Sequence, residues 1–382
     1  MLVLNNKTIL LISPNNWGTM HISKHHYAIE LARLGNTVFF LNPPNQEITF
    51  KKKIDIIPIK EHPNLYCINH DLPFPYHLKF RFTRIFHFLM GFYIKSLQKK
   101  IGKPLDIVWS FDLNYIYPFS LFPKKAIKIL HPVDEPGSPA ALKSAIGADI
   151  IFSVTREILE KYQQFSVPKI FINHGLSNFF LSGKFENKTN GQIRVGFSGN
   201  LIRHDLDRST FLQIIGENPS VLFECWGSYK PNELNIGGHH DQSAKEFIAE
   251  LSKLPNVILH GAVPPSELKK GYARMDAFLI CYDVERDVSK GTNYHKVIEF
   301  LCTGKVIVSN NITTYQQRPD LVQMVPERNT NASLPGLFRN VLSSLEVYNA
   351  ETLREKRILF SHENTYEAQI KRIDKYLAEI KK

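Results

Sequence analysis

The chain has 382 residues, of which 43% are hydrophobic and 22% charged, a length that exceeds one comfortable core and suits two domains of roughly 150 to 200 residues. It contains no apolar run of about 18 residues, and residues 1–6 lack the profile of a signal peptide, so we expect a cytoplasmic protein with no membrane span. The net charge of +11 favours an anionic partner, which is nucleic acid, an anionic membrane surface or a phosphate-bearing substrate.

The first half of the chain alternates strand and helix patterns, as a parallel α/β sheet does. The apolar run at residues 8–13 predicts a strand buried on both faces. A helix follows at about residues 23–34, and Gly35 stands where a helix end favours a left-handed residue. A strand at residues 37–41 completes a unit that opens a doubly wound domain. Further strands are predicted at residues 65–68, 107–110, 127–130, 150–154 and 170–172.

Residues 76–103 combine basic and aromatic side chains. The stretch holds seven lysines and arginines and no acidic residue. Its aromatic residues include Phe80, Phe82, Phe86, Phe88, Phe92 and Tyr93. Such a stretch predicts either a surface for the headgroups of anionic lipids or a domain helix with its apolar side in the core. The first alternative implies a peripheral position at the inner face of the plasma membrane.

A polar segment at residues 181–192 divides the chain and predicts a linker. We therefore expect an N-terminal Rossmann-like domain at residues 1–180 and a C-terminal one at residues 193–349. A helical tail at residues 350–382 is expected to pack back on the N-terminal domain. The predicted fold class is α/β, with two doubly wound domains facing across a cleft. Strands of the second domain are predicted at residues 193–198, 221–226, 257–260, 277–281 and 306–309.

The segment at residues 287–311 reads as a loop, a helix and a buried strand. Lys290 and Gly291 belong to the loop, and Thr292 or Asn293 is a competent N-cap for a helix that runs to about residue 303. Unpaired amides at such a helix start, together with a glycine that permits close approach, predict a pyrophosphate site.

Within this helix, His295, Lys296 and Glu299 are predicted to share one face. Lys296 would add positive charge next to the pyrophosphate. The carboxylate of Glu299 can accept hydrogen bonds from a ribose diol, as an acidic residue does in dinucleotide-binding folds. The alternative for Glu299 is a surface residue on an ordinary amphipathic helix.

The sequence HKVIEFLCTGKVIVS, from residue 295 onwards, resembles the donor-binding signature of GT-B glycosyltransferases of the family-4 type. In that signature the matched glutamate holds the ribose of the nucleotide, so the resemblance gives this role to Glu299. The positions that match in register are Lys296, Glu299, Phe300, Leu301, Gly304 and Lys305.

Other segments are similar to the family in the same order. Residues 195–201, which include Gly199 and Asn200, resemble the first strand and loop of the donor domain, and Arg203 then corresponds to a basic residue that meets the donor diphosphate. Residues 256–268 resemble a segment beside the nucleobase. Residues 173–180 resemble the element that ends the N-terminal domain.

Two departures from the family pattern concern the transferred sugar. Family members carry another glutamate, which contacts the transferred sugar, eight residues before the one that Glu299 matches. This chain has Gly291 there, so Asp287, Glu285 or backbone amides would hold the sugar instead. The family's first loop is rich in glycine, whereas this one contains only Gly18. These departures bear on the identity of the sugar and on the stereochemistry of transfer.

His131 and Asp134 follow a predicted strand of the first domain and are candidates for contact with the reacting sugar, although Asp134 is equally suited to cap a turn before Pro136. No metal site is predicted, because the histidines at residues 237–241 lack a third spaced ligand. The four cysteines lie far apart and are expected to be buried, reduced thiols.

The resemblance implies a hexosyltransferase-like enzyme that uses a nucleoside-diphosphate sugar, retains the anomeric configuration and needs no cofactor or metal. Its acceptor would be a glycan or a lipid-linked glycan, in bacterial surface polysaccharide or glycoconjugate synthesis. Arg203, Lys290 and Lys296 would neutralise the leaving diphosphate, and an inverting enzyme would need Asp134 as general base. The alternatives are a sugar-nucleotide 2-epimerase of the same fold, a non-catalytic GT-B protein and a nucleic-acid-binding protein. The absence of a nucleic-acid recognition motif argues against the last of these.

Overall fold

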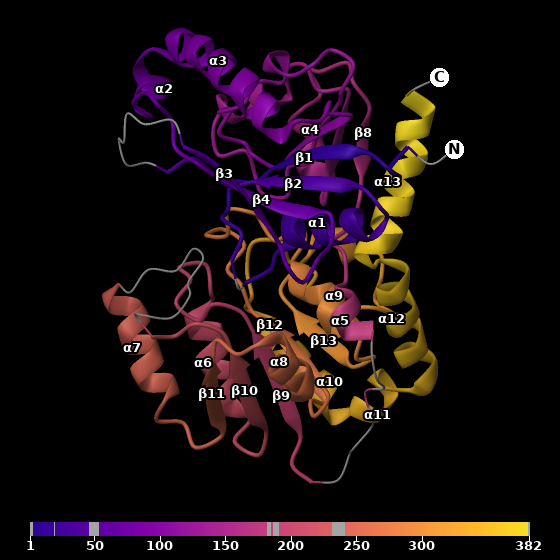
Figure 1. The fold of residues 1–382 in the computed structure, drawn as a ribbon. Helices are drawn as coiled ribbons and strands as arrows, with labels where there is room; N and C mark the ends of the chain where they lie inside the picture. Colours follow the sequence, from indigo (N-terminus) through magenta and orange to yellow (C-terminus); the bar gives the residue numbers. More distant parts are fainter. Residues whose placement is uncertain are drawn as a thin grey trace. The chain divides into compact units, whose positions relative to one another are not determined.

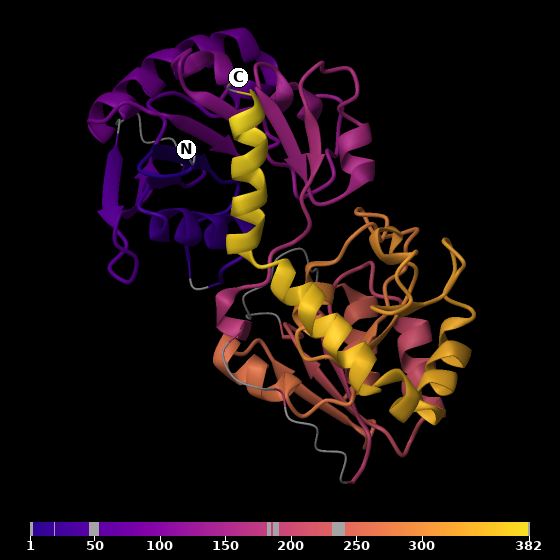
Figure 2. The same ribbon diagram turned by 90° about the vertical axis from the view of Figure 1, so that its right-hand side faces the viewer.

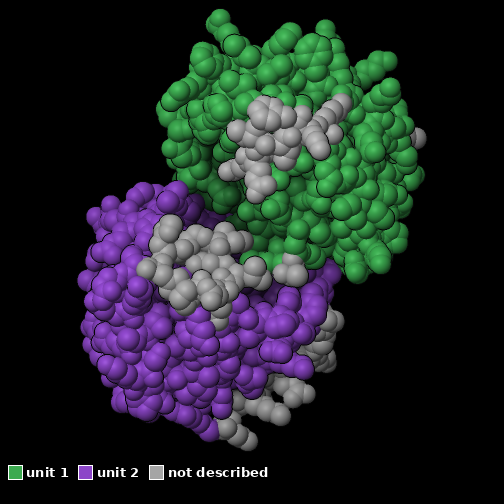
Figure 3. Space-filling view, turned by 60° about the vertical axis from the view of Figure 1, so that its left-hand side comes forward, with its two compact units in different colours: residues 1–175, 366–382 green, residues 176–365 purple. Residues whose placement is uncertain are grey.

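The computed structural model describes residues 3–18, 20–45, 53–181, 185, 191–230 and 241–380. The chain forms two compact units (Figure 3). Unit 1 comprises residues 1–175 and 366–382, and unit 2 comprises residues 176–365. Residues 176–180, predicted for the first domain, therefore belong to unit 2, and the predicted tail is shared between the units. Most of the predicted linker, residues 182–184 and 186–190, lies outside the described residues.

Unit 1 is built on an eight-stranded sheet in the order β3-β4-β2-β1-β5-β6-β7-β8. Only β3 runs antiparallel to its neighbour; the other pairs are parallel. The predicted parallel sheet is confirmed, and β3 at its edge is a strand that the sequence did not predict. The strands are β1 (Thr8–Ile12), β2 (Thr37–Leu41), β3 (Ile54–Pro58), β4 (Leu65–His70), β5 (Ile107–Ser110), β6 (Ile127–Leu130), β7 (Ile150–Ser153) and β8 (Lys169–Phe171).

Both faces of this sheet are covered, which explains why its central strands are continuous apolar runs. On β1, Leu10 and Ile12 pack on the core that contains α3 (Thr83–Ile101), and Ile9 and Leu11 pack on the core that contains α1 (Ser23–Arg33). The C-terminal helix α13 (Tyr366–Ile380) lies against α1 on the second face (Figures 1 and 2). Gly35 follows α1 with φ +82°, as predicted for a left-handed helix end.

The shorter helices of unit 1 lie before α3 and after β7. They are α2 (Leu78–Arg81) and α4 (Arg156–Glu160). Thr155 caps α4, because its hydroxyl accepts a hydrogen bond from the amide of Ile158.

Unit 2 is built on a six-stranded, fully parallel sheet in the order β11-β10-β9-β12-β13-β14. The order reverses at β9 and β12, which are neighbours, and ligands of such sheets bind at the carboxyl ends of the strands beside this reversal. Five strands match predicted ones. The strands are β9 (Arg194–Ser198), β10 (Leu222–Trp226), β11 (Val257–Gly261), β12 (Ala277–Ile280), β13 (Val306–Ser309) and β14 (Gln323–Met324).

Helices cover both faces of this second sheet as well. One core contains α6 (Arg208–Glu217), α7 (Gln242–Leu251) and α10 (Leu334–Ser343), and the other contains α8 (Pro265–Tyr272) and α9 (His295–Leu301). The remaining helices of unit 2 are α5 (Asn178–Leu181), α11 (Leu345–Tyr348) and α12 (Glu351–Glu363), of which α12 packs against α9. Among the described residues, no helix has the length and apolar character needed to cross a bilayer.

Candidate functional site

Glu299 is a carboxylate held in place on α9. Its side chain is only 8% exposed and accepts a hydrogen bond from Lys296 Nζ at 2.7 Å and one from the hydroxyl of Tyr272 at 3.3 Å. His295 Nδ1 lies 3.3 Å from its other oxygen. The predicted common face of His295, Lys296 and Glu299 is therefore confirmed. The opposite side of α9 is in the core, so the helix cannot turn and the carboxylate has a fixed position.

The start of α9 differs from the prediction. The N-cap is Tyr294, not Thr292 or Asn293, and no side chain caps the helix. The hydroxyl of Thr292 instead donates to the carbonyl of Ser289 at 2.9 Å, and its amide donates to the same carbonyl at 3.1 Å. Asn293 is buried beside them. The predicted pyrophosphate amide at Thr292 is thus already used within the loop.

Asp287 organises this loop. Its carboxylate accepts hydrogen bonds from the amide of Gly291 at 2.9 Å, from the hydroxyls of Ser289 and Tyr294 at 2.6 and 2.8 Å, and from the amide of Ser289 at 2.9 Å. Burial disfavours the charged form, but these hydrogen bonds outweigh it and hold the pKa of Asp287 below its usual value. Both carboxylate oxygens of Asp287, a residue considered above for contact with the sugar, therefore already accept hydrogen bonds from the loop itself.

The two predicted lysines also have partners. Lys290 is exposed, adopts φ +52° and donates from Nζ to the carbonyl of Glu285 at 2.7 Å. A non-glycine residue rarely takes this left-handed conformation, and here the bonds of Asp287 to the neighbouring residues hold it. Lys296 is paired with Glu299. Both predicted diphosphate-binding lysines therefore already donate hydrogen bonds to groups of the protein.

Arg203 lies on the same side of unit 2 and forms a pair with Asp205. Its Nε donates to Asp205 Oδ1 at 2.7 Å and its Nη2 donates to Oδ2, while Asp287 Oδ1 lies 3.8 Å from Nη2. The hydrogen bonds to Asp205, opposed by burial, raise the pKa of Arg203, and its guanidinium stacks over the ring of Tyr282. Within the described chain it donates side-chain hydrogen bonds only to Asp205, which leaves Nη1 for an oxyanion.

Gly199 and Asn200 form a tight turn where β9 ends. The amide of Gly199 donates to the carbonyl of Trp226 at 2.9 Å, and Asn200 Oδ1 accepts from the amide of Ile202 at 3.0 Å. Gly227 follows β10 with φ +133°, and a Cβ there would lie 1.8 Å from the carbonyl oxygen of Gly199. The turn therefore depends on a close backbone approach that only glycine allows.

A polar network joins these pieces at the carboxyl edge of the sheet. Asn310, which follows β13, accepts from the amide of Tyr282 at 2.9 Å and donates to the hydroxyl of Tyr294 at 3.4 Å. Tyr294 donates to Asp287, and Asp287 faces Arg203. The sequence analysis missed Asn310, Tyr294 and Asp205. The position of Asn310 directly after β13 was the available signal, whereas Asp205 and Tyr294 follow no strand directly.

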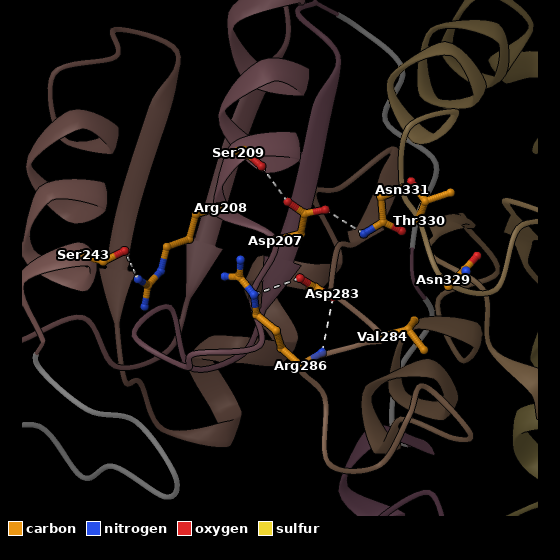
Figure 4. Close-up of a pocket in the computed structure, with 10 residues that line it drawn as sticks. All are labelled: Asp207, Arg208, Ser209, Ser243, Asp283, Val284, Arg286, Asn329, Thr330 and Asn331. Carbon is orange, nitrogen blue, oxygen red and sulfur yellow. Dashed lines mark hydrogen bonds and ion pairs between the residues drawn. The ribbon is translucent and has the colours of Figure 1, made fainter.

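A pocket of about 400 Å³ in unit 2 is lined by none of the predicted donor residues, although Arg208 in its lining donates from Nη2 to the carbonyl of Arg203 at 3.2 Å (Figure 4). Asp207, the N-cap of α6, binds Ser209 and Asn331 there, and Asp283 pairs with Arg286 at 3.0 Å. Because these contacts tie the start of α6 to loops before α10 and after β12, we read the pocket as a structural junction.

In unit 1, His131 directly follows β6 and is fully buried, which contradicts the prediction that it lies at an accessible strand end. Its ring centroid lies 4.9 Å from that of Phe111, 5.2 Å from Tyr27 and 6.0 Å from Trp109. Strand alternation is the reason, because His131 continues the face of Ile129, which points into the core beneath α1. We assign it no contact with a sugar.

Burial, with the nearby His174 and Lys24, lowers the pKa of His131 to about 3 from an ordinary value of 6.5. The unfolded chain binds a proton at this ring near pH 6.5 and the folded chain only near pH 3, so the free energy of unfolding falls as the pH drops below 6.5. We predict that the wild type loses about 2 kcal/mol more stability than His131→Phe between pH 7 and pH 5.

Urea denaturation of both proteins at the two pH values measures this difference. The buried His25 and His70, whose pKa values are lowered to about 4 by burial, titrate in both proteins and cancel in the comparison. Equal losses in the two proteins would show that His131 is protonated in the folded state.

Asp134, the second candidate in unit 1, has an exposed side chain. Burial lowers the pKa of Lys24, and the charges of Asp134 and Asp112 partly oppose this shift. Asp134 is therefore accessible to a ligand, as predicted, while His131 is not.

Unit 1 also contains a pocket of about 670 Å³ at the carboxyl edge of its sheet. Residues at or after the ends of β1, β2, β4 and β5 line it together with Lys53 and Asp55, and eight of the 17 lining residues carry an amide or carboxylate side chain. Among these eight are Asn42, Asn69, Asp71, Asp112 and Asn114. The hydroxyl of Tyr117 lies 2.9 Å from His70 Nε2, which lies 3.0 Å from the carbonyl oxygen of Asn42, so this wall of the pocket is fixed.

The four cysteines are buried and free, as predicted. Within the described ranges, no three histidine, cysteine, aspartate or glutamate side chains are arranged to hold a metal ion. Residues 237–240, considered above for metal binding, lie outside the described residues.

Solved structures identify the fold. No protein-family model and no curated protein matches the sequence. Sucrose-phosphate synthase from Thermosynechococcus elongatus has a TM-score of 0.67 at 12% identity over 98% of this chain and 99% of that one. Anabaena HepE in complex with UDP and glucose has a TM-score of 0.65 at 10% identity over 97% and 99%. The chain has the GT-B fold. The predicted fold class is thereby confirmed.

A third neighbour is the lipopolysaccharide outer core galactosyltransferase WaaB, with a TM-score of 0.63 at 10% identity over 97% of this chain and 99% of that one. These neighbours are GT-B glycosyltransferases, and at such identities the likeness shows the fold alone. The site residues of unit 2 and the pocket of unit 1 each lie at the carboxyl edge of their sheet, where ligands bind in folds of this kind.

Proposed function

We propose that the chain is a glycosyltransferase of the family-4 type, which moves a sugar from a nucleoside-diphosphate sugar to a glycan or lipid-linked glycan with retention of configuration. The observation that carries this proposal is Glu299. A nearly buried carboxylate is fixed on α9, at the position where the sequence resembles the donor signature, in a chain with the GT-B fold. An ordinary surface glutamate would be mobile and exposed.

Glu299 is suited to the ribose of the donor. A carboxylate has about four acceptor positions, and this one accepts hydrogen bonds from Lys296 and Tyr272 while His295 Nδ1 lies 3.3 Å away. A ribose hydroxyl can therefore add a further hydrogen bond to an oxygen whose position is already set. The preorganised site avoids the entropy cost of ordering the side chain when the nucleotide binds.

Arg203 is proposed to meet the diphosphate. As the bond between the sugar C1 and the phosphate oxygen breaks, negative charge grows on that oxygen, and an Nη1 donor that is already oriented by Asp205 stabilises it. The acceptor oxygen then bonds to C1 on the same face, and its proton passes to the departing phosphate. This route conserves the anomeric configuration and needs no protein base.

The acceptor is proposed to bind in the pocket of unit 1. Amide groups such as Asn69 and Asn114 donate and accept hydrogen bonds, and carboxylates such as Asp71 accept them, which suits a ligand rich in hydroxyl groups. Asp55, Asp71 and Asp112 outnumber the single Lys53 in the lining, so the pocket favours an uncharged saccharide over a phosphorylated one.

The neighbouring structures suggest the first substrates to test. HepE was solved with UDP and glucose, which makes UDP-glucose the first donor, and WaaB acts on a lipopolysaccharide core, which supports a lipid-linked acceptor in surface polysaccharide synthesis. We further propose that the chain works at the inner face of the plasma membrane, with residues 76–103 against anionic lipid.

The test is product analysis by mass spectrometry after incubation with UDP-sugars, with and without a glycan acceptor. A transferase releases UDP and forms a new glycoside in the presence of the acceptor. A sugar-nucleotide epimerase would change the donor alone and leave the acceptor untouched. Recovery of both substrates unchanged with every donor would overturn the proposal in favour of a non-catalytic protein.

A further inference from the structure

Large apolar side chains are exposed on α2 and α3 of unit 1. Phe80 is 72% exposed, Phe88 66% and Phe92 56%, and Phe82 and Ile85 are exposed as well. A soluble surface seldom gathers so many large apolar residues on neighbouring turns. The two helices lie at the margin of unit 1, outside its sheet (Figure 1).

Helix α3 has two apolar faces, and the core uses only one. The buried face consists of Phe86, Met90, Tyr93, Ile94, Leu97 and Ile101. Ile85, Phe88 and Phe92 are spaced i, i+3 and i+7, so they form a second row on the opposite side. The alternative that residues 76–103 form a domain helix with its apolar side in the core thus explains the first face of α3 but not the second.

Basic side chains accompany the second row. Arg84, Lys95 and Lys99 are exposed and fall on the same side of α3, since Arg84 precedes Phe88 by four residues and Lys99 follows Phe92 by seven. Lys95 Nζ lies over the ring of Phe92 at 5.9 Å. Among the described residues, no acid forms an ion pair with any of these three or with Arg81, so their charge is directed outwards.

We propose that this surface docks on an anionic lipid bilayer. The α2–α3 face is defined as Phe80, Phe82, Ile85, Phe88 and Phe92 with Arg81, Arg84, Lys95 and Lys99. Its phenylalanines enter the headgroup layer, and its guanidinium and ammonium groups contact lipid phosphates. Charge complementarity selects this occupant, because a purely apolar partner would leave the basic groups without counter-charges.

The occupant is a lipid surface rather than a nucleic acid because Ile85, Phe88 and Phe92 form a row on the exposed side of α3. Bases stack on aromatic platforms set in a basic groove, whereas Phe80, Phe88 and Phe92 are each more than half exposed. The inference rests on the proposed function only in that docking would bring a lipid-linked acceptor within reach. Vesicle binding itself is measured without a donor.

Co-sedimentation of the full chain with vesicles tests the inference. Vesicles of phosphatidylglycerol and phosphatidylcholine should pellet the chain at least about tenfold more strongly than phosphatidylcholine alone, and high salt should release it. The substitutions Phe88→Ser and Phe92→Ser together, or Lys95→Glu and Lys99→Glu together, should each lower the partition coefficient at least about tenfold.

Matched variants on unit 2 serve as controls. Val347→Ser with Leu359→Ser removes comparably exposed apolar groups, and Lys245→Glu with Lys253→Glu reverses two exposed charges on and beside α7. Both controls should pellet like the wild type. Loss of binding in the controls too, equal pelleting with neutral vesicles, or binding to single-stranded DNA in place of vesicles would overturn the inference.

The same preparations separate this inference from the proposed function. All variants should bind UDP like the wild type, because none of the substituted residues belongs to the donor site. Nucleotide binding and glycosyl transfer without vesicle binding would refute the docking surface alone. Vesicle binding without any turnover would refute the glycosyltransferase alone.

Discussion

Replacing Glu299 with alanine should weaken the binding of the donor nucleotide by about 1.5 to 3 kcal/mol, which is roughly 10- to 100-fold in Kd. The carboxylate is the charged acceptor proposed for the ribose, and its position is fixed before the ligand arrives. Calorimetric titration with the nucleoside diphosphate measures the change. Truncation also removes the partner of Lys296, but this amine is partly exposed and water can take over its hydrogen bond.

Glu30 provides a matched control. It also lies on a helix, its side chain is 10% exposed, and it pairs with Arg33 at 2.7 Å across three residues. Because α1 belongs to unit 1, Glu30→Ala should cost comparable stability and leave nucleotide affinity unchanged. If Glu299→Ala bound the nucleotide as tightly as the wild type, the assignment of α9 to the donor would be wrong.

The second large effect is expected at Arg203. The substitution Arg203→Gln should lower kcat about 100-fold or more while changing nucleotide affinity less, because the charge on the leaving phosphate grows towards the transition state. Glutamine is preferred to glutamate here, since a new carboxylate would face Asp205 and Asp287, which are both buried.

Arg318 is the control for this substitution. It binds Asp320 through Nε and Nη2, both at 2.9 Å, and lies over the ring of Phe360, so it repeats the geometry of Arg203, Asp205 and Tyr282. Its side chain is 41% exposed, against 36% for Arg203. Steady-state kinetics of the two variants should differ sharply. Equal values of kcat would mean that Arg203 only stabilises unit 2.

The sequence predicted those features that depend on short-range patterns. Continuous apolar runs gave the central strands, because parallel strands covered on both faces have no polar side. Helical spacing placed His295, Lys296 and Glu299 on one face. The edge strand β3 was missed because its residues are only partly buried and it ends in a proline, so its pattern is that of a loop.

The site was predicted less completely, for reasons visible in particular residues. The start of α9 depends on Asp287, whose bonds to Gly291 and Tyr294 fold the preceding loop, and loop composition does not show which carboxylate will do so. His131 was judged from its position after a strand. Whether a residue there faces the core or the ligand depends on strand alternation and on what packs above, in this case Tyr27 and Phe111.

The central claim is that unit 2 binds a nucleoside diphosphate through Glu299 and Arg203. A thermal-shift titration of the intact chain with UDP, GDP, CDP and dTDP tests it most directly, since a ligand that binds only the folded state raises Tm, and does so more the lower its Kd. One nucleotide should stabilise the chain by about 2.7 kcal/mol at a concentration 100 times its Kd, and a 10- to 100-fold higher Kd in Glu299→Ala should cut this to between about 1.4 and 0.4 kcal/mol at the same concentration. No shift with any of the four, or an undiminished shift in Glu299→Ala, would contradict the claim.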